Sequence, residues 1–456
     1  MRFLLELIFG FNGTLLVINK VGIRKWLFIS LAILCSIYCL GLLKQMGIKS
    51  VFQQWSGLDY IIIGFLGIQL IWVFIIPYCT RGSIKLGIKE IFSFSVLLLY
   101  FPLSLMIKSK YIDWEKVKSL VRHLTIGLAV LHLILYVGET LVEDATFTLN
   151  FFAIVNKITF GYSKRPLVLM PAYYIRVVYA ASIFLLVPIY FMLNERTWKK
   201  SAWLYYAIAV GGILTTVAKS LFLGCLLGIV FYLLFIFKYY YSHLKNKLII
   251  RCGRLIVLTL AFIVVFDTAV SDGYIMRRWN TMFFIKASEK QVSNGKETME
   301  PITEEEKNQD VLEGTERSNY TRVEQTAKLI EHWKARPILG HGYGSSVPNY
   351  IRGSEDTPYS YEMFLPAMLM KLGIIGVSFW IILFVYLVRN IVILSEKYKE
   401  RALSIGYLLI ALVITTQFNP FLINSSGMAI VLFILLELKV MMSTNETCFI
   451  EDSMEV

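Results

Sequence analysis

The sequence predicts an all-α integral membrane protein, with about twelve transmembrane helices and a large outer loop between the ninth and tenth. Hydrophobic residues make up 57% of its 456 residues and charged residues only 17%, whereas an average soluble domain is about 25% charged. The mean hydropathy is +0.63. Several separate apolar runs reach the ~18 to 20 residues that a helix needs to cross a bilayer. This composition excludes a soluble globular domain and a disordered chain.

The charge balance fits a membrane protein better than a nucleic-acid-binding protein. Lys and Arg total 45 against 32 Asp and Glu, which gives a formal net charge of +13. Basic residues accumulate in the cytoplasmic loops of membrane proteins, and this explains such an excess without nucleic acid as a partner. The six cysteines show neither paired nor metal-ligand spacing, so we expect small core residues instead of a disulfide framework or a metal site.

The candidate spans divide the chain into four parts. Spans 1–9 occupy residues 1–270, and a large loop over 271–362 separates them from spans 10–12 in 363–442. A cytoplasmic tail over 443–456 follows the last span. The expected spans cover approximately residues 3–18, 26–43, 58–77, 91–107, 121–138, 174–193, 202–217, 220–237, 254–270, 363–388, 403–418 and 424–442.

The distribution of basic residues predicts that both ends of the chain lie in the cytoplasm. These residues concentrate in alternate short loops, at 108–122, 238–254 and 389–401, and loops of this kind stay inside. The same alternation places the loops at 139–173 and 271–362 on the outer side. The first apolar run contains charged and polar residues and no small-residue cleavage site, so we expect a weak first span and no cleavable signal peptide.

The large outer loop has two halves of different character. Residues 289–316 are acidic and poor in apolar side chains, which predicts a solvated or disordered stretch. After them, Thr321-x-x-Glu324 is typical of a capping box, and an amphipathic helix over 321–335 is expected to lie on the membrane surface. The residues that recur at helical spacing on its apolar face are Val323, Ala327, Ile330 and Trp333.

The most informative segment runs from Arg322 to Gly376. It reads RVEQTAKLIEHWKARPILGHGYGSSVPNY, then a variable stretch, then YEMFLPAMLMKLGIIG. An Arg-led amphipathic helix, a Pro-Ile-Leu-Gly-x-Gly-x-Gly turn and a helix that runs to Leu-Gly-Ile-Ile-Gly follow in order. This order, with the largest outer loop between spans 9 and 10, resembles the O-antigen ligase and polymerase family of bacterial envelope glycosyltransferases.

The resemblance implies a fold and a reaction. The fold would be the all-helical class of membrane glycosyltransferases (GT-C-like), in the bacterial inner membrane with the active site facing the periplasm. Such enzymes transfer a glycan from an undecaprenyl-diphosphate carrier to a sugar hydroxyl, without nucleotide sugar, metal or other cofactor. The reaction needs cations that hold the diphosphate and a base near the acceptor hydroxyl.

Four basic residues are candidates for diphosphate binding, because a guanidinium fork matches phosphate oxygens. The resemblance assigns this role first to Arg322, which opens the loop helix. Arg176 lies where the outer loop 139–173 enters the sixth span, and Arg165 is close by in sequence. Lys219, at the turn between spans 7 and 8, stands where family members often carry Arg. For each of these residues a surface or interfacial charge is the alternative interpretation.

The base is where this sequence departs from the family pattern. Ligases commonly carry a His near the start of the helix that ends at Gly-x-x-Gly, and this chain has Glu362 near that point. A partly buried carboxylate can serve as general base. The alternative is His341, between glycines that allow close backbone approach to a ligand. Three outer aromatic residues are candidates for stacking on sugar faces: Tyr343, Tyr359 and Tyr361.

These observations favour a polysaccharide polymerase (O-antigen, capsule or exopolysaccharide) that joins undecaprenyl-diphosphate-linked repeat units. Its partners would be the carrier-linked oligosaccharide, the glycan acceptor, and chain-length regulator and flippase proteins. An O-antigen ligase that transfers the glycan to lipid A–core is the first alternative. A transporter of lipid-linked oligosaccharides is the second, but the sequence lacks a convincing repeat and its candidate charges gather at one membrane face.

Overall fold

The structure is a computed structural model, and almost all of the chain that it describes is helical. The other described residues form turns, connecting segments and one antiparallel pair of strands, in which β1 (Leu167–Leu169) pairs with β2 (Ile175–Val177). The all-α fold class is therefore confirmed. The described residues are 30, 33–38, 40–41, 44, 47, 55–142, 167–169, 175–177, 181–195, 200–240, 245–269, 304–352 and 357–454.

Residues 57–142 form two long apolar segments, each made of consecutive short helices, and one uninterrupted helix. The first segment consists of α4 (Gly57–Leu70), the π-helical turn η2 (Ile71–Ile75) and α5 (Ile76–Thr80). The second consists of α6 (Ile84–Ile91), η3 (Phe92–Phe94), α7 (Ser95–Leu98) and α8 (Tyr100–Lys108). The continuous helix is α9 (Trp114–Val142).

The later helices complete the bundle. After the hairpin come η5 (Ser182–Leu186), α11 (Val187–Asn194), α12 (Lys200–Thr215), α13 (Lys219–Tyr240) and α14 (Lys245–Ala269). They are followed by α16 (Glu304–Lys334), α17 (Phe364–Thr416), η6 (Phe421–Ile423) and α18 (Ser425–Met454). Six helices within the described residues are long and apolar enough to cross a membrane, and three shorter apolar helices accompany them.

Most of the expected spans coincide with these helices, and two differ in an informative way. The sixth span was expected from residue 174, but residues 175–177 form strand β2 and the helical part begins at Ser182. β-Branched residues such as Ile175 and Val177 favour strand over helix. Spans 10 and 11 both lie in α17, which turns back at Lys399, where φ is 32° and ψ is −105°. The first expected span lies outside the described residues.

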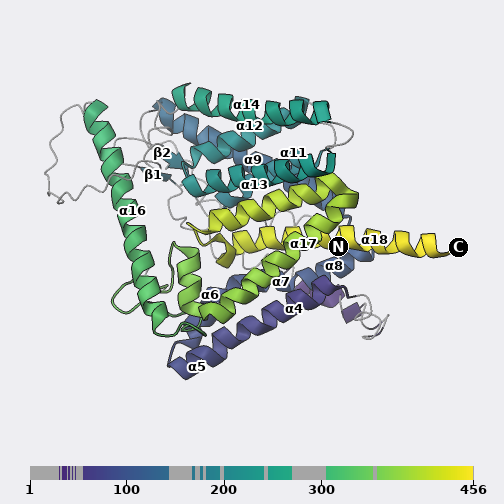
Figure 1. Cartoon of the computed structure of the whole chain (residues 1–456), viewed down its shortest axis with the longest axis horizontal. Helices are drawn as coiled ribbons and strands as arrows, with labels where there is room; N and C mark the ends of the chain where they lie inside the picture. Colours follow the sequence, from purple (N-terminus) through teal and green to yellow (C-terminus); the bar gives the residue numbers. More distant parts are fainter. Residues whose placement is uncertain are drawn as a thin grey trace.

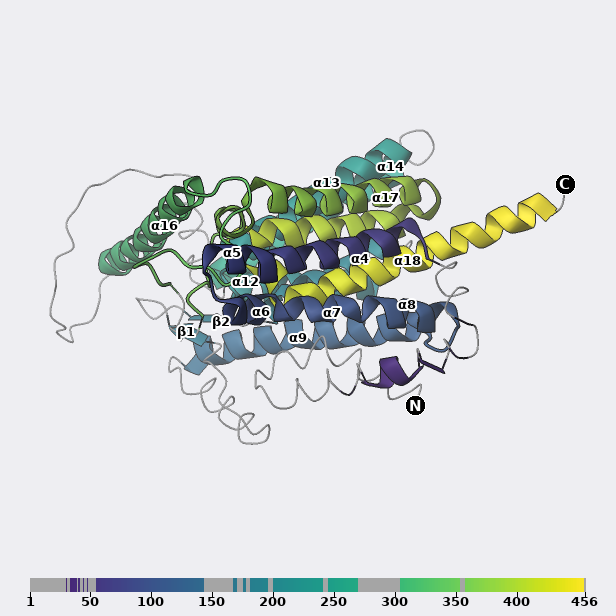
Figure 2. The same cartoon turned by 90° about the horizontal axis from the view of Figure 1, so that it is seen from below.

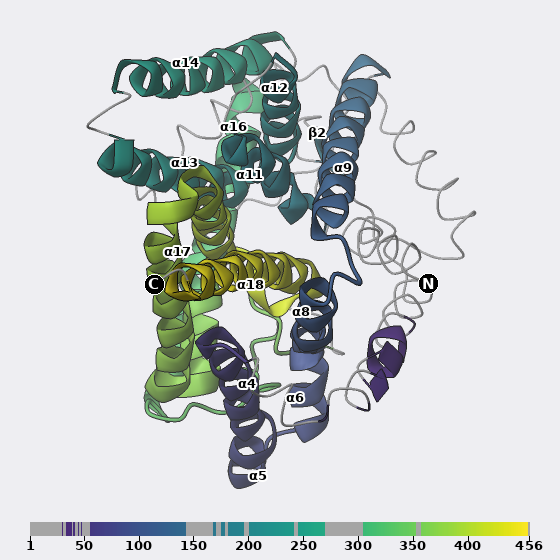
Figure 3. The same cartoon turned by 90° about the vertical axis from the view of Figure 1, so that its right-hand side faces the viewer.

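The long helices run roughly parallel, and α16 lies across one end of their bundle (Figures 1 and 2). The hairpin and the turn between α5 and α6 lie at this same end, and the chain ends beyond α18 at the other. We call these the α16 end and the α18 end. Figure 3 shows α18 in the middle of the bundle, where residues such as Ile434 and Leu436 are fully buried. That the α16 end faces outward stays a prediction.

Helix α16 is longer than predicted, and it packs through a different face. It begins at Glu304, so residues 304–316 are helical and the expectation of disorder is wrong there. The expectation that they are solvated stays a prediction, and residues 289–303 lie outside the described residues. Glutamate favours helix, and a carboxylate in the first turn interacts favourably with the helix dipole. Thr321 is an interior residue and not a cap. Gln325 and Leu329 are buried, whereas Val323, expected on the apolar face, is 68% exposed.

Several buried charged residues lie between the helices toward the α18 end of the bundle. Glu437 accepts hydrogen bonds from Arg401 (2.7 Å) and Tyr190 (3.0 Å), and Lys118 is 3.3 Å away. Asp59 pairs in the same way with Lys439. Buried charges are therefore not confined to the end of the bundle that carries the candidate site residues. Each carboxylate has cationic partners, as burial of a charge requires, and these contacts join helices within the bundle.

Candidate functional site

The glycine-rich turn after α16 packs tightly against the helix bundle. Gly340, Gly342 and Gly344 have φ values of +67°, +89° and +80°, which favour glycine over any other residue. A Cβ atom at Gly340 would lie 2.4 Å from the carbonyl oxygen of Lys371, and one at Gly344 would lie 2.4 Å from the backbone nitrogen of Gly87. The glycines therefore allow helices to approach the turn, and the expectation that they make room for a ligand is wrong.

The candidate base His341 is part of this packed turn. Its backbone N–H donates to the carbonyl oxygen of Met370 at 3.0 Å. Its Nε2 atom lies 3.0 Å from the carbonyl oxygen of His332, and the two imidazole rings stack with centroids 4.0 Å apart. Burial lowers the pKa of His341. These contacts hold the ring in the fold, and this arrangement makes His341 a weaker candidate for the base than Glu362.

A buried ion pair that was not predicted from the sequence contacts the glycine-rich turn. Lys371 Nζ lies 2.5 Å from Glu90 Oε1, and the two side chains are only 1% and 2% exposed. Glu90 Oε2 accepts a hydrogen bond from the backbone N–H of Gly344 at 2.6 Å. Lys371 also donates to the carbonyl oxygen of Tyr359 at 2.8 Å. The one signal in the sequence was a lysine inside an otherwise apolar run. The pair joins α6, the glycine turn and the segment before α17.

The three aromatic residues proposed to stack on sugars are structural instead. Tyr343, Tyr359 and Tyr361 are all buried. Tyr343 donates its hydroxyl hydrogen to Gln69 Oε1 at 2.7 Å, and the hydroxyl of Tyr361 accepts from the backbone N–H of Val347 at 2.7 Å. The expectation of exposed aromatic platforms is therefore wrong at these positions.

Arg322 and Glu362, expected to serve one reaction, lie in contact. Arg322 Nε is 3.3 Å from Glu362 Oε2, and Arg352 Nη2 is 3.1 Å from Glu362 Oε1. Each carboxylate oxygen thus has its own arginine. The side chains of Arg322, Arg352 and Glu362 are 33%, 36% and 42% exposed, so solutes can reach them. The cluster combines two cations suited to phosphate with one carboxylate suited to accept a proton.

Gln325 fixes the distance between the two halves of this cluster. Its side chain is buried one helical turn from Arg322, and only 1% of the residue is exposed. Its Oε1 accepts hydrogen bonds from the backbone N–H groups of Glu362 (3.1 Å) and Met363 (3.0 Å). Met363 is the N-cap residue of α17 and Glu362 directly precedes it, and the N–H groups at the N-terminus of a helix lack partners within the helix. A side chain of α16 therefore caps α17.

Replacement of Gln325 by Leu is expected to reduce activity and stability together, because two partly buried N–H groups would lose their acceptor. Each lost partner costs about 1–3 kcal/mol. Gln325→Glu keeps an acceptor oxygen and should retain more activity than Gln325→Leu. Glycan assembly and the melting temperature of the purified protein measure the two effects. Equal activity of the Leu variant and the wild type would show that this cap does not position the cluster.

Lys219, another cation predicted to bind the diphosphate, is connected to the cluster only indirectly. Lys219 begins α13 at the α16 end. The next residue, Ser220, accepts a hydrogen bond from Asn419 at 2.8 Å, and the nearby carbonyl oxygen of Gln417 accepts from the backbone N–H of Phe364 at 3.2 Å. The turn at Lys219 is thus linked through the loop after α17 to the start of α17, beside Glu362.

Two predicted cations have no described side chain. The backbone of Arg176 lies in β2, at the α16 end of the bundle (Figure 1), but its side chain is outside the described part. Arg165 lies outside the described residues altogether. That Arg176 shares a diphosphate-binding site with Arg322 stays a prediction.

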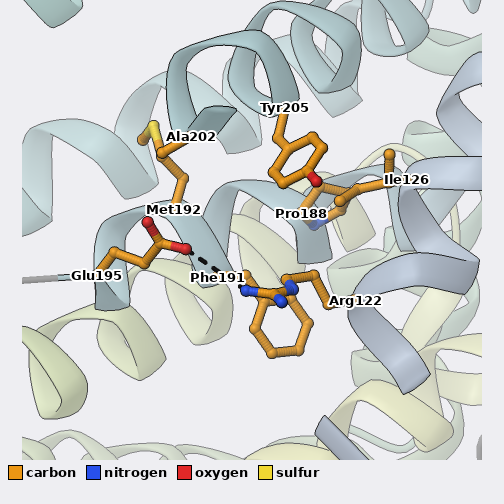
Figure 4. Close-up of a pocket in the computed structure, with 8 residues that line it drawn as sticks. All are labelled: Arg122, Ile126, Pro188, Phe191, Met192, Glu195, Ala202 and Tyr205. Carbon is orange, nitrogen blue, oxygen red and sulfur yellow. Dashed lines mark hydrogen bonds and ion pairs between the residues drawn. The ribbon is translucent and has the colours of Figure 1, made fainter. Parts of the chain in front are cut away.

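A separate pocket lies between α9, α11 and the start of α12 (Figure 4). Arg122 and Glu195 face each other across it, with Arg122 Nη1 3.5 Å from Glu195 Oε1. Its other lining residues are mostly apolar, and none of them belongs to the cluster around Glu362. In the chain as described, no group of three or more His, Cys, Asp and Glu side chains could hold a metal ion. Metal independence stays a prediction.

Comparison with known proteins agrees with the sequence motif. Residues 204–381 match the family model described as O-antigen ligase. This stretch contains Lys219, Arg322, His341 and Glu362, but not Arg176. Searches of curated proteins and of solved structures each returned no match. The resemblance first seen between Arg322 and Gly376 is therefore confirmed over residues 204–381, which match the O-antigen ligase family.

Proposed function

We propose that the protein is a polysaccharide polymerase that joins undecaprenyl-diphosphate-linked repeat units at the outer face of the bacterial inner membrane. The observation that carries the proposal is the cluster in which Arg322 and Arg352 both contact Glu362. It lies within the O-antigen ligase domain and at the end of the bundle crossed by α16. Two arginines suit a diphosphate, and the carboxylate suits the proton of an acceptor hydroxyl.

The proposed reaction uses these residues in one transfer. The acceptor hydroxyl loses its proton to Glu362, and its oxygen forms a bond with the anomeric carbon of the donor glycan. The bond between that carbon and the diphosphate oxygen breaks, and the carrier diphosphate leaves with the electron pair. Arg322 stabilises the negative charge that develops on the leaving group. The proposed transfer is balanced without water, a metal ion, an oxidant or a reductant.

The identity of the candidate base favours a polymerase over a ligase. Ligases of the family commonly have His near the point of the motif where this chain has Glu362. A polymerase also handles two carrier-linked glycans, so it needs more cations. The topology predicted from the sequence assigns five cations to segments on the outer side: Arg165, Arg176, Lys219, Arg322 and Arg352. An O-antigen ligase is the second candidate, because the matching family model carries that description. The acceptor would then be lipid A–core or another glycan acceptor.

A transporter is the weaker alternative. The buried charges described at the α18 end are paired, and ion pairs that join helices explain them without a transport path. The proposed partners are the carrier-linked oligosaccharide, the glycan acceptor, a chain-length regulator and a flippase. Nucleic acid and cofactors are not among them.

Deletion of the gene distinguishes polymerase from ligase. A polymerase deletion should accumulate single repeat units, because units reach the outer face but are not joined. Mass spectrometry of carrier-linked glycans, with a complemented strain as control, gives the length distribution. Long chains still attached to the carrier would overturn the polymerase and favour the ligase. Repeat units confined to the inner leaflet would favour the transporter.

A further inference from the structure

We propose that Arg322 and Arg352 together form the binding site for the donor's diphosphate, and that the Glu362 carboxylate occupies this site until the donor arrives. The inference rests on the proposed function. It adds Arg352 as a donor-binding residue and assigns to Glu362 two successive positions. Donor binding would then release the base, so that the carboxylate becomes available only when there is a glycan to transfer.

The geometry shows a carboxylate held as a phosphate would be. Arg322 comes from α16 and Arg352 from the loop after the glycine turn, and each contacts a different oxygen of Glu362. The two guanidinium groups therefore converge on one small anion. Diphosphate presents oxygens of the same kind, and arginine forks bind them through parallel hydrogen bonds.

Only the side chain of Glu362 has to move. Its backbone N–H is held by buried Gln325, and three residues earlier the carbonyl oxygen of Tyr359 is held by buried Lys371. The carboxylate itself is 42% exposed. Exposed ion pairs contribute little to stability, so a diphosphate can displace this carboxylate while the backbone stays in place.

Charge favours the exchange and prepares the base. The donor diphosphate, esterified at both ends, carries two negative charges, which the two arginines neutralise. The displaced carboxylate then no longer contacts a cation, so its oxygens are available to accept the proton of the acceptor hydroxyl. After transfer the proton is on Glu362, and the carrier diphosphate leaves with one additional negative charge.

Binding of diphosphates to the purified full chain in detergent tests the exchange. Two probes are used, inorganic pyrophosphate and farnesyl diphosphate, with titration calorimetry as the readout. Glu362→Gln should bind both about 3- to 10-fold more tightly than wild type, because it removes the competing carboxylate. Arg352→Ala should bind both about 10-fold more weakly. Tighter binding of farnesyl diphosphate alone also supports the proposal and assigns recognition to the lipid carrier.

Matched variants separate the exchange from nonspecific charge effects. Glu324→Gln removes a carboxylate from α16, the helix that carries Arg322, where Glu324 pairs with Lys328. Arg336→Ala removes an exposed arginine just after the end of α16. Neither variant should change the affinity for either diphosphate. Arg352→Lys keeps the charge without the fork and guards against misfolding of the alanine variant. Three results would each overturn the inference. Glu362→Gln could bind the diphosphates no more tightly than wild type, or Arg352→Ala could bind them as tightly as wild type. The third is that the substitutions change the binding of inorganic pyrophosphate alone. Because the deletion strain tests the polymerase independently, failure here leaves that proposal standing.

Discussion

Replacement of Glu362 by Gln is expected to reduce glycan assembly by roughly 10²–10⁴-fold, the usual contribution of a general base. Gln keeps the size of the side chain and its capacity to bind arginine through oxygen, but it does not take the acceptor's proton. The measurement is the rate at which carrier-linked glycans lengthen in membranes that contain equal amounts of wild-type or variant protein. His341→Gln should have a much smaller effect, because that ring is held by His332 and the packed turn.

The comparison with Glu324→Gln shows whether the loss is specific. Glu324 lies on α16 close to Arg322 in sequence and pairs with Lys328 at 3.1 Å, so its replacement removes the same charge without touching the cluster. Its activity should match wild type. An active Glu362→Gln protein together with an inactive His341→Gln protein would move the base to His341.

Replacement of Lys371 by Met is expected to destabilise the protein by about 3–5 kcal/mol, because it leaves the carboxylate of Glu90 buried without its cation. The double variant Lys371→Met with Glu90→Gln should be more stable than the sum of the two single effects predicts, since neither charge remains. Unfolding in denaturant, measured in one detergent for all variants, gives the comparison. The loss of structure should include the glycine turn, which the pair holds through Gly344.

Lys328→Met is the matched control for that series. Lys328 makes an ion pair with Glu324 that is about two-fifths exposed on both sides, so its loss should cost less than about 1 kcal/mol. Strict additivity of the Lys371 and Glu90 variants would contradict a coupled buried pair. Destabilisation by Lys328→Met as large as that by Lys371→Met would contradict the role assigned to burial.

Composition and hydropathy predicted most of the bundle, because a helix that crosses a membrane has to be apolar over most of its length. The differences arose where this rule does not apply. Helix α16 starts at Glu304, since acidic residues that suggest a solvated coil are also good helix formers. Residues expected to start the sixth span form strand β2 instead, because a short apolar run that contains β-branched residues is compatible with a helix or a strand.

The site was predictable residue by residue but not as an arrangement. Arg322 and Glu362 were assigned separate roles from their positions in the motif, and their contact across 40 residues required the fold. The roles of Gln325 and Glu90 depend on contacts with distant backbone groups, which no local pattern specifies. The glycine turn indicated a close approach correctly, but the approaching group is the carbonyl oxygen of Lys371 instead of a ligand.

The central claim is that the cluster of Arg322, Arg352 and Glu362 joins one carrier-linked repeat unit to another. The most direct test is a reconstituted reaction that contains only purified protein, lipid vesicles and single carrier-linked repeat units isolated from the deletion strain. Wild-type protein should convert the units into longer carrier-linked glycans with release of the carrier diphosphate, and the Glu362→Gln protein should not. Transfer only after lipid A–core is added, or equal lengthening by both proteins, would contradict the claim.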